Sequence, residues 1–271
     1  MVKKYINNRL FILYLIPFFI GLLTVLSFQP FNFTLINIII FPLFFYLIVF
    51  ISKKSRSVYR KKPYKRNFFL VGISFGFGFY LSGISWITNS LTFDESFKVL
   101  IPLALILIPL FLSLFFAFPI LFIGPKLKFD FSSIIIFSGI LAFSDYLRGK
   151  LFTGFPWNLW AYSTSWSSEI LQILNFTGLY SYNLIVITLF SLPVIIFLNI
   201  SKVRKMIIIF LIGLFILGLY IFGSFIINKN NKFVSTVGEK ILIKIVSPNF
   251  DLEYGLTEKD VEQRLRKLIR Y

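Results

Sequence analysis

Cysteine and histidine are both absent from the 271 residues of this chain. Without cysteine the chain can form neither a disulfide nor a thioester. Without both residues it cannot build a Cys/His metal centre or use either side chain in catalysis. Ser163, Ser165 and Ser167 therefore have no histidine base to activate them. The sequence also contains no phosphate-binding loop, and we expect neither a metal site nor a cofactor.

Acidic residues are scarce as well, since 11 Asp and Glu stand against 28 Lys and Arg, giving a formal net charge of +17. In a soluble protein this charge would suggest nucleic-acid binding. Here 57% of the residues are hydrophobic and 20% are aromatic, which is far more than a globular core needs. We therefore expect a membrane protein without a nucleic-acid partner, whose loop cations set topology and meet anionic lipid.

Apolar runs long enough to cross the hydrocarbon core of a bilayer recur along the chain. They predict an all-α polytopic membrane bundle of about seven transmembrane helices, with prolines bending the fourth. Gly72 and Gly76, four residues apart in the third run, indicate close contact with another helix. The predicted spans cover residues 10–27, 33–51, 68–87, 99–122, 131–147, 178–200 and 206–227.

Basic residues are distributed unevenly between the predicted loops. The loops on one side carry 16 of them, and the short loops on the other side carry 3. Membrane proteins hold their excess of Lys and Arg in cytoplasmic loops. The N-terminus is therefore predicted to be cytoplasmic. Seven crossings then place the loop between spans five and six, and the C-terminal tail, outside.

The segment from Asp145 to Ser163 separates spans five and six and reads Asp-Tyr-Leu-Arg-Gly-Lys-Leu-Phe-Thr-Gly-Phe-Pro-Trp-Asn-Leu-Trp-Ala-Tyr-Ser. Its glycine and proline break a helix, and its two tryptophans and Tyr162 favour the headgroup level of a bilayer. It is either an ordinary interfacial connection with aromatic anchors or a loop that lies on, or dips into, one membrane face. Asp145 and Arg148 can pair on one helix face. They either anchor the end of the span or face a lipid or substrate cleft.

The composition of the chain changes from apolar to polar at Asn228. Residues 228–239 are polar and resemble a linker, and the β-branched run 241–246 predicts a buried strand that ends at Pro248. Thr257 and Asp260 form a capping-box-like start to a helix with an apolar stripe. One strand and one helix cannot bury a core alone. We therefore expect the opening of a further domain.

The segment from Asp145 to Ser163 resembles the hallmark of the apolipoprotein N-acyltransferases, although Asp145 stands where that family usually has Glu. Residues 28–31, 76–87 and 177–184 agree with other family motifs in order and spacing. Residues 245–249 are similar to the first strand of the family's nitrilase-like domain, with Ser247 and Pro248 in place of the usual Gln and Gly. The resemblance implies a transmembrane domain (1–227), a linker (228–239) and the truncated start of a carbon-nitrogen hydrolase, or nitrilase-like, domain (240–271).

The resemblance implies a multi-pass protein of the bacterial inner (cytoplasmic) membrane that acts in the last step of lipoprotein biosynthesis. In this step an acyl group moves from a phospholipid to the α-amine of the N-terminal diacylglyceryl-cysteine of a lipoprotein. The family uses a cysteine thioester, a glutamate base and a supporting lysine, all in the nitrilase-like domain. None can be placed here, so we expect this chain to be an inactive fragment, which a separate chain could complete.

What the resemblance leaves to this chain is lipid binding. We expect Arg148 to contact a phosphate, because a planar guanidinium matches phosphate oxygens. The other residues expected at the lipid or substrate site are Asp145, Phe155, Pro156, Trp157 and Tyr162. Two alternatives stay open: a non-catalytic lipid-binding membrane partner, and an unrelated seven-span transporter. The transporter predicts polar residues in mid-span, and these spans are almost wholly apolar.

Overall fold

The structure, a computed structural model, describes residues 9–54, 65–152, 154–236, 243–250 and 255–270. All regular secondary structure in these ranges is helical. Within the described ranges, six helices are long and apolar enough to cross a membrane, and another apolar helix, Phe11–Ser27, is shorter. They coincide with the seven apolar runs, so the predicted all-α membrane bundle is confirmed.

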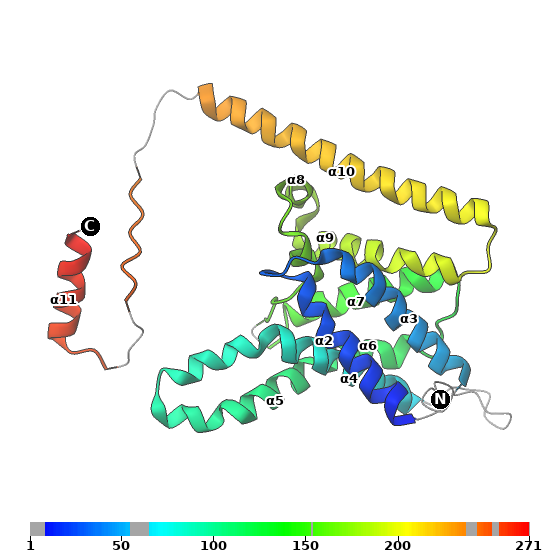
Figure 1. Cartoon of the computed structure of the whole chain (residues 1–271), viewed down its shortest axis with the longest axis horizontal. Coiled ribbons are helices and arrows are strands. Elements are labelled where there is room, and N and C mark those ends of the chain that lie inside the picture. The colour runs from blue at the N-terminus through cyan, green and yellow to red at the C-terminus, as the bar shows by residue number, and fades with distance from the viewer. Residues whose placement is uncertain (1–8, 55–64, 153, 237–242, 251–254, 271) are drawn as a thin grey trace.

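The chain folds as a bundle of α2 to α9, with α10 across one side and α11 apart from it (Figure 1). Short 3₁₀ or π segments, labelled η, extend several of the helices. In chain order the elements are η1 (Phe11–Leu15), α2 (Ile16–Leu23), η2 (Thr24–Ser27), η3 (Thr34–Ile36), α3 (Asn37–Lys54), α4 (Lys65–Ile84), η4 (Ser85–Thr92), η5 (Glu95–Leu100), α5 (Ile101–Leu112), α6 (Leu114–Ile123), α7 (Phe131–Arg148), η6 (Trp160–Thr164), α8 (Ser168–Leu171), α9 (Leu174–Ser191), η7 (Leu192–Phe197), α10 (Lys202–Thr236) and α11 (Glu258–Ile269).

The fourth span is divided into α5 and α6 at Ser113. The Ser113 hydroxyl donates to the carbonyl of Leu110 at 2.6 Å, and such back-bonding competes with the helical ladder and bends helices. Pro109 and Pro119 lie on either side of the break and each remove one backbone donor.

Glycines bring α4 into backbone contact with its neighbours. A Cβ on Gly72 would lie 2.6 Å from the Cα of Ala117, and one on Gly76 would lie 2.8 Å from the Cα of Ser113. The predicted close contact is thus confirmed, and its partner is α6. On another face of α4, Gly78 and Gly21 allow the same approach between α4 and α2. Small residues therefore set the spacing of three helices at the centre of the bundle.

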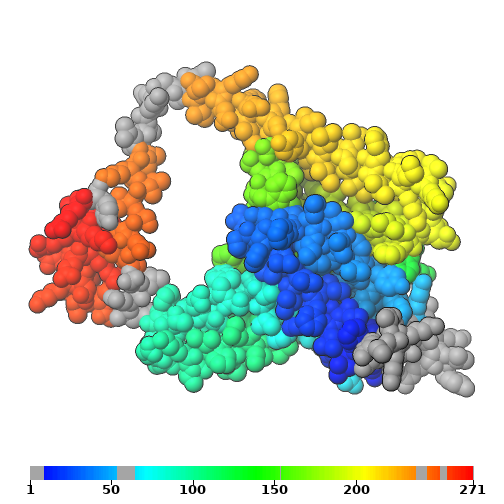
Figure 2. All heavy atoms as spheres, viewed as in Figure 1, coloured from blue at the N-terminus to red at the C-terminus, as the bar shows by residue number. Residues whose placement is uncertain are grey.

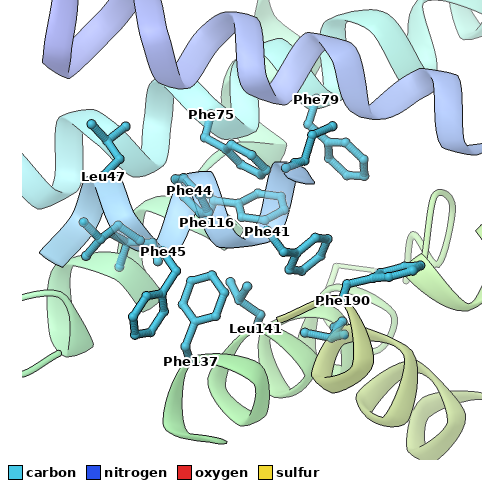
Figure 3. Packing of buried hydrophobic residues seen from close by; sticks show 14 of the residues in the cluster. Phe41, Phe44, Phe45, Leu47, Phe75, Phe79, Phe116, Phe137, Leu141 and Phe190 are labelled. Carbon is cyan, nitrogen blue, oxygen red and sulfur yellow. The ribbon is translucent and has the colours of Figure 1, made fainter. Parts of the chain in front are cut away.

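Phenylalanine rings fill the interior between α3, α4 and α7 (Figure 3). Phe44 stacks on Phe75 with ring centroids 3.9 Å apart, and Phe45 meets Phe137 edge-on at 5.4 Å. Offset and edge-to-face pairs of this kind are the favoured arrangements of aromatic rings. The core therefore holds three spans together through interlocked rings.

The helix α10 extends well beyond its predicted end, through residues 228–236, which were expected to be linker. No glycine or proline interrupts this stretch before Gly238, so nothing local stops the helix. Only 6% of its most apolar window is buried in the protein. An all-round apolar helix with so little protein contact is typical of one that faces lipid.

The C-terminal part stands apart from the bundle (Figure 2). The predicted capping box is confirmed: Thr257 and Asp260 satisfy each other's backbone donors at the start of α11. The Thr257 bonds also hold the pKa of the Asp260 carboxylate below its usual range. The predicted strand is absent from described residues 243–246, where Ile243 and Ile245 are exposed; positions 241 and 242 lie outside the described part. A strand needs a neighbour for its ladder, and residues 243–250 have none in the structure.

Candidate functional site

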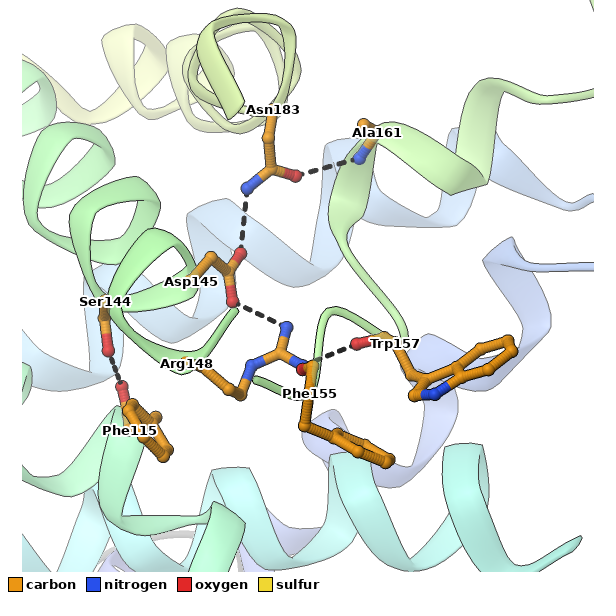
Figure 4. A network of polar contacts seen from close by, with 8 residues as sticks. All are labelled: Phe115, Ser144, Asp145, Arg148, Phe155, Trp157, Ala161 and Asn183. Carbon is orange, nitrogen blue, oxygen red and sulfur yellow. Dashed lines mark hydrogen bonds and ion pairs between the residues drawn. The ribbon is translucent and has the colours of Figure 1, made fainter. Parts of the chain in front are cut away.

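A buried ion pair lies beneath the loop that follows α7 (Figure 4). Arg148, the last residue of α7, is 1% exposed. Its Nη2 donates to the Oδ1 of Asp145 at 2.9 Å, and its Nη1 donates to the carbonyls of Phe155 and Trp157, each at 2.6 Å. One guanidinium therefore neutralises a carboxylate and fixes the path of the loop, which uses the fork of donors peculiar to arginine.

Asn183 of α9 extends this network to a third element. Its Nδ2 donates to the Oδ2 of Asp145 at 2.9 Å, while its Oδ1 accepts from the backbone N–H of Ala161 at 2.9 Å. Both oxygens of the buried carboxylate thus have a donor, which is what a charge needs in a low-dielectric interior. The network ties α7, α9 and both ends of the loop together.

The backbone of the loop supports the same arrangement. Gly154 has a φ of 83°, and a Cβ there would lie 2.6 Å from the carbonyl oxygen of Gly149. Only glycine fits this turn without strain. The N–H of Phe155 donates to the carbonyl of Arg148 at 2.9 Å and closes the turn onto the end of α7.

Beside the clamped loop lies a groove of about 470 Å³. Trp157 projects away from the polar network (Figure 4), is 51% exposed and packs edge-on against Trp86 with centroids 5.4 Å apart. The lining combines aromatic rings with amide and hydroxyl groups, a mixture suited to the boundary between headgroups and hydrocarbon. The lining residues are Phe28, Gln29, Pro156, Trp157, Asn158, Tyr162 and Ser165. We call this pocket the loop groove.

Tyr162 brings a hydroxyl to the loop groove. Partial burial, and then the neighbouring Tyr180, raise the pKa of this hydroxyl above its ordinary value, which outweighs the opposing effect of Arg148. The group is therefore neutral at physiological pH and can donate a hydrogen bond.

Trp160, in contrast, is buried inside the protein. Its side chain is 1% exposed, stacks on Phe79 at 4.8 Å and meets Phe41 edge-on at 4.7 Å. Indole is large enough to anchor a core as well as an interface. Trp160 therefore joins the loop to the aromatic interior.

The structure divides the six predicted site residues into two groups. Pro156, Trp157 and Tyr162 line the loop groove, and Phe155 is half-buried against the core. Asp145 and Arg148 lie together beneath them, bonded to protein groups. Sequence reasoning named Asn183 only as part of a motif. Its signal was an amide side chain inside an apolar span, where polar side chains bond across helices.

No metal centre is apparent in the part of the chain that the structure describes, which contains no group of three or more Asp, Glu, Cys or His side chains able to hold an ion. The chemistry available there is hydrogen bonding, one buried ion pair and aromatic contact.

These features define a polytopic helical membrane protein whose loop at one membrane face is fixed by a buried ion pair. Residues 20–192 match the family described as the apolipoprotein N-acyltransferase N-terminal domain. The chain belongs to the apolipoprotein N-acyltransferase family, as the resemblance predicted.

Curated relatives agree with this assignment. The apolipoprotein N-acyltransferases of Sinorhizobium medicae and Brucella melitensis are each 29% identical, over 183 and 184 residues. That of Rhodopseudomonas palustris is 28% identical over 186 residues. These alignments cover 67%, 67% and 68% of this chain and 34% of each relative. The chain thus spans about a third of the length of the curated relatives it matches.

Proposed function

We propose that this chain is the membrane part of an apolipoprotein N-acyltransferase and that its loop groove holds the headgroup region of the phospholipid acyl donor. The acyl group is destined for the α-amine of a diacylglyceryl-cysteine at the N-terminus of a lipoprotein. The observation that carries the proposal is a groove lined by Pro156, Trp157 and Tyr162 on a loop that a buried ion pair holds in place.

In this proposal the residues of the site have distinct roles. Trp157 and Pro156 offer an apolar wall, and the neutral hydroxyl of Tyr162 offers a hydrogen bond to a phosphate or ester oxygen. Arg148 and Asp145 are positioning residues. The guanidinium is 1% exposed and its Nη atoms already bond protein oxygens, so the phosphate contact expected from the sequence is replaced by a role in holding the loop.

The transfer itself needs a group that this sequence lacks. A thioester forms on a thiolate, and no cysteine is present in the 271 residues. In our proposal the nucleophile belongs to polypeptide outside this sequence that carries the nitrilase-like chemistry. The 271 residues alone are inactive in acyl transfer and lie in the bacterial inner membrane, with the N-terminus in the cytoplasm and the loop groove on the opposite face.

Tryptophan fluorescence tests the loop groove. The purified chain in detergent micelles is titrated with phosphatidylglycerol whose acyl chains are brominated near the headgroup, because bromine quenches indole on contact. We expect saturable quenching that Trp157→Phe removes. Trp166→Phe is the matched control, since Trp166 is 56% exposed and lies outside the groove, against 51% for Trp157. Equal loss in the two variants, or quenching that never saturates, would refute the site.

A second experiment tests whether these residues alone can transfer the acyl group. The chain is incubated with phosphatidylethanolamine and a diacylglyceryl lipopeptide, and acylation of the peptide amine is followed by mass spectrometry. We expect no product. Acylation by these residues unaided would contradict the proposal that the nucleophile lies elsewhere.

A further inference from the structure

A second groove, between α6 and α7, reaches the first residues of the loop at Leu151 and Phe152 and has a volume of about 420 Å³. Eleven of its twelve lining residues are apolar. The exception is Ser144, whose hydroxyl already donates to the carbonyl of Phe115. The lining therefore offers no free polar group to a ligand, and burying a polar group of a ligand there without a hydrogen bond would be costly. The groove suits a hydrocarbon, and we call it the tail groove.

The length of the tail groove indicates which hydrocarbon it suits. Its lining runs from Phe111 to Phe122, which is about 16 Å at the helical rise per residue. One leaflet of a bilayer is about 15 Å of hydrocarbon, half of the core thickness. The tail groove is therefore about as long as the acyl chains of one leaflet, which are the apolar groups that a bilayer supplies at this depth.

The end of the tail groove nearest the loop is covered by a strained residue. Phe152 has a φ of 52°, a conformation that bulky side chains rarely adopt. Its ring meets Phe111 edge-on with centroids 5.6 Å apart, although the residue is 73% exposed. The turn around it is held by Leu151 N–H to Leu147 O at 2.7 Å and Gly154 N–H to Leu151 O at 2.9 Å. Strain of this kind persists where the surroundings over-determine it, often at ligand clamps.

We propose that the tail groove binds one acyl chain of a bilayer phospholipid and that Phe152 closes its end beside the loop. The tail groove is apolar and the loop groove is mixed, and both flank the loop that Arg148 holds. Together they match the two parts of an amphiphile. The proposal rests on the proposed function only for the identity of the lipid, because the tail groove has its own measurement.

Photolabelling in vesicles tests the occupant. The full chain is reconstituted in phosphatidylcholine vesicles that contain phosphatidylcholine with a diazirine midway along one acyl chain, illuminated, digested and mapped by mass spectrometry. Phe143 lines the tail groove and is 54% exposed; Ile136, on the same helix and outside the groove, is 52% exposed. We expect at least about fivefold more label near Phe143, on the order of 1 kcal/mol of preference. Labelling that follows exposure alone would overturn the proposal.

Two sets of variants test the groove and the Phe152 cap independently. Leu147→Trp fills the groove and should abolish the enrichment, whereas Ile135→Trp on the same helix should leave it intact. Phe152→Ala and Phe152→Gly both remove the ring, and only glycine also relieves the backbone strain. We expect both to lower the enrichment and only Phe152→Gly to raise the unfolding temperature. Unchanged enrichment in both Phe152 variants would refute the cap.

Two outcomes distinguish this proposal from the one before it. If Trp157 shows no saturable quenching while the photolabel is still enriched near Phe143, lipid binding in the loop groove is refuted and lipid binding in the tail groove is not. Crosslinks that join two copies of the chain through the tail groove, in place of lipid adducts, would overturn the tail groove.

Discussion

Arg148 shows how much depends on whether a charge is buried. Lys98 and Glu95 form an ion pair at the same three-residue spacing, yet their side chains are 45% and 85% exposed. The side chains of Arg148 and Asp145 are 0% and 6% exposed. Exposed pairs contribute little because water screens them, whereas removing one partner of a buried pair leaves an uncompensated charge. The two pairs therefore make a matched comparison within one chain.

We predict that Arg148→Ala lowers the free energy of unfolding by about 3–5 kcal/mol, because Asp145 would stay buried without its cation and two loop carbonyls would lose their donor. Lys98→Ala should leave stability unchanged within error. Equilibrium unfolding of the purified protein in mixed micelles checks both. Equal effects from the two variants would show that the pair beneath the loop is solvated.

The sequence predicted that Asp145 and Arg148 could pair, because residues three apart share a helix face. It could not decide whether that face points inward, since that depends on which helices pack against α7. The exposure of the tryptophans also depends on packing. Trp157 and Trp160 are three residues apart in one loop, yet one is 51% and the other 1% exposed. Residue type gives a preference for an interface, and only the packing shows which indole reaches it.

At the scale of elements, the helices were predictable because apolar length is a local property, and the glycine contact was predictable from spacing. The strand that the sequence predicted is not formed at described residues 243–246, because β-branched residues favour a strand only where a neighbouring strand supplies its hydrogen bonds. The extension of α10 through residues 228–236 also escaped prediction. Polar composition there marks the end of the apolar run without marking the end of the helix.

We predict that Gly76→Leu destabilises the bundle by at least about 1–3 kcal/mol, the range for overpacking, because the added side chain meets the backbone of α6 at Ser113. The control is Gly218→Leu in α10, where a Cβ would meet nothing within 4 Å. Unfolding by a denaturing detergent, followed by circular dichroism, measures both. A loss of stability as large for Gly218→Leu would contradict the prediction: leucine has the higher helix propensity, so that loss would show that a leucine destabilises the protein without any contact with α6.

At the scale of the whole molecule, the bundle is built around α4, and α7 carries the loop on one of its ends. The helix α7 has 18 residues and is therefore about 27 Å long, close to the thickness of a bilayer's hydrocarbon core. Lys126 precedes it and Lys150 follows it, and both are exposed. The two lysines must then lie on opposite faces of the membrane if α7 spans it.

The uneven distribution of basic residues predicts which of these lysines is cytoplasmic. Because the sequence has no cysteine, a single introduced cysteine is the only thiol that a maleimide can label. We predict that a membrane-impermeant maleimide added to intact spheroplasts labels Lys150→Cys and labels Lys126→Cys only after the membrane is opened. Either substitution removes a single charge from a bias of 16 to 3, too little to invert the protein. Labelling of Lys126→Cys in intact spheroplasts, with Lys150→Cys protected, would place the loop groove in the cytoplasm and remove it from the face where we propose that acyl transfer occurs.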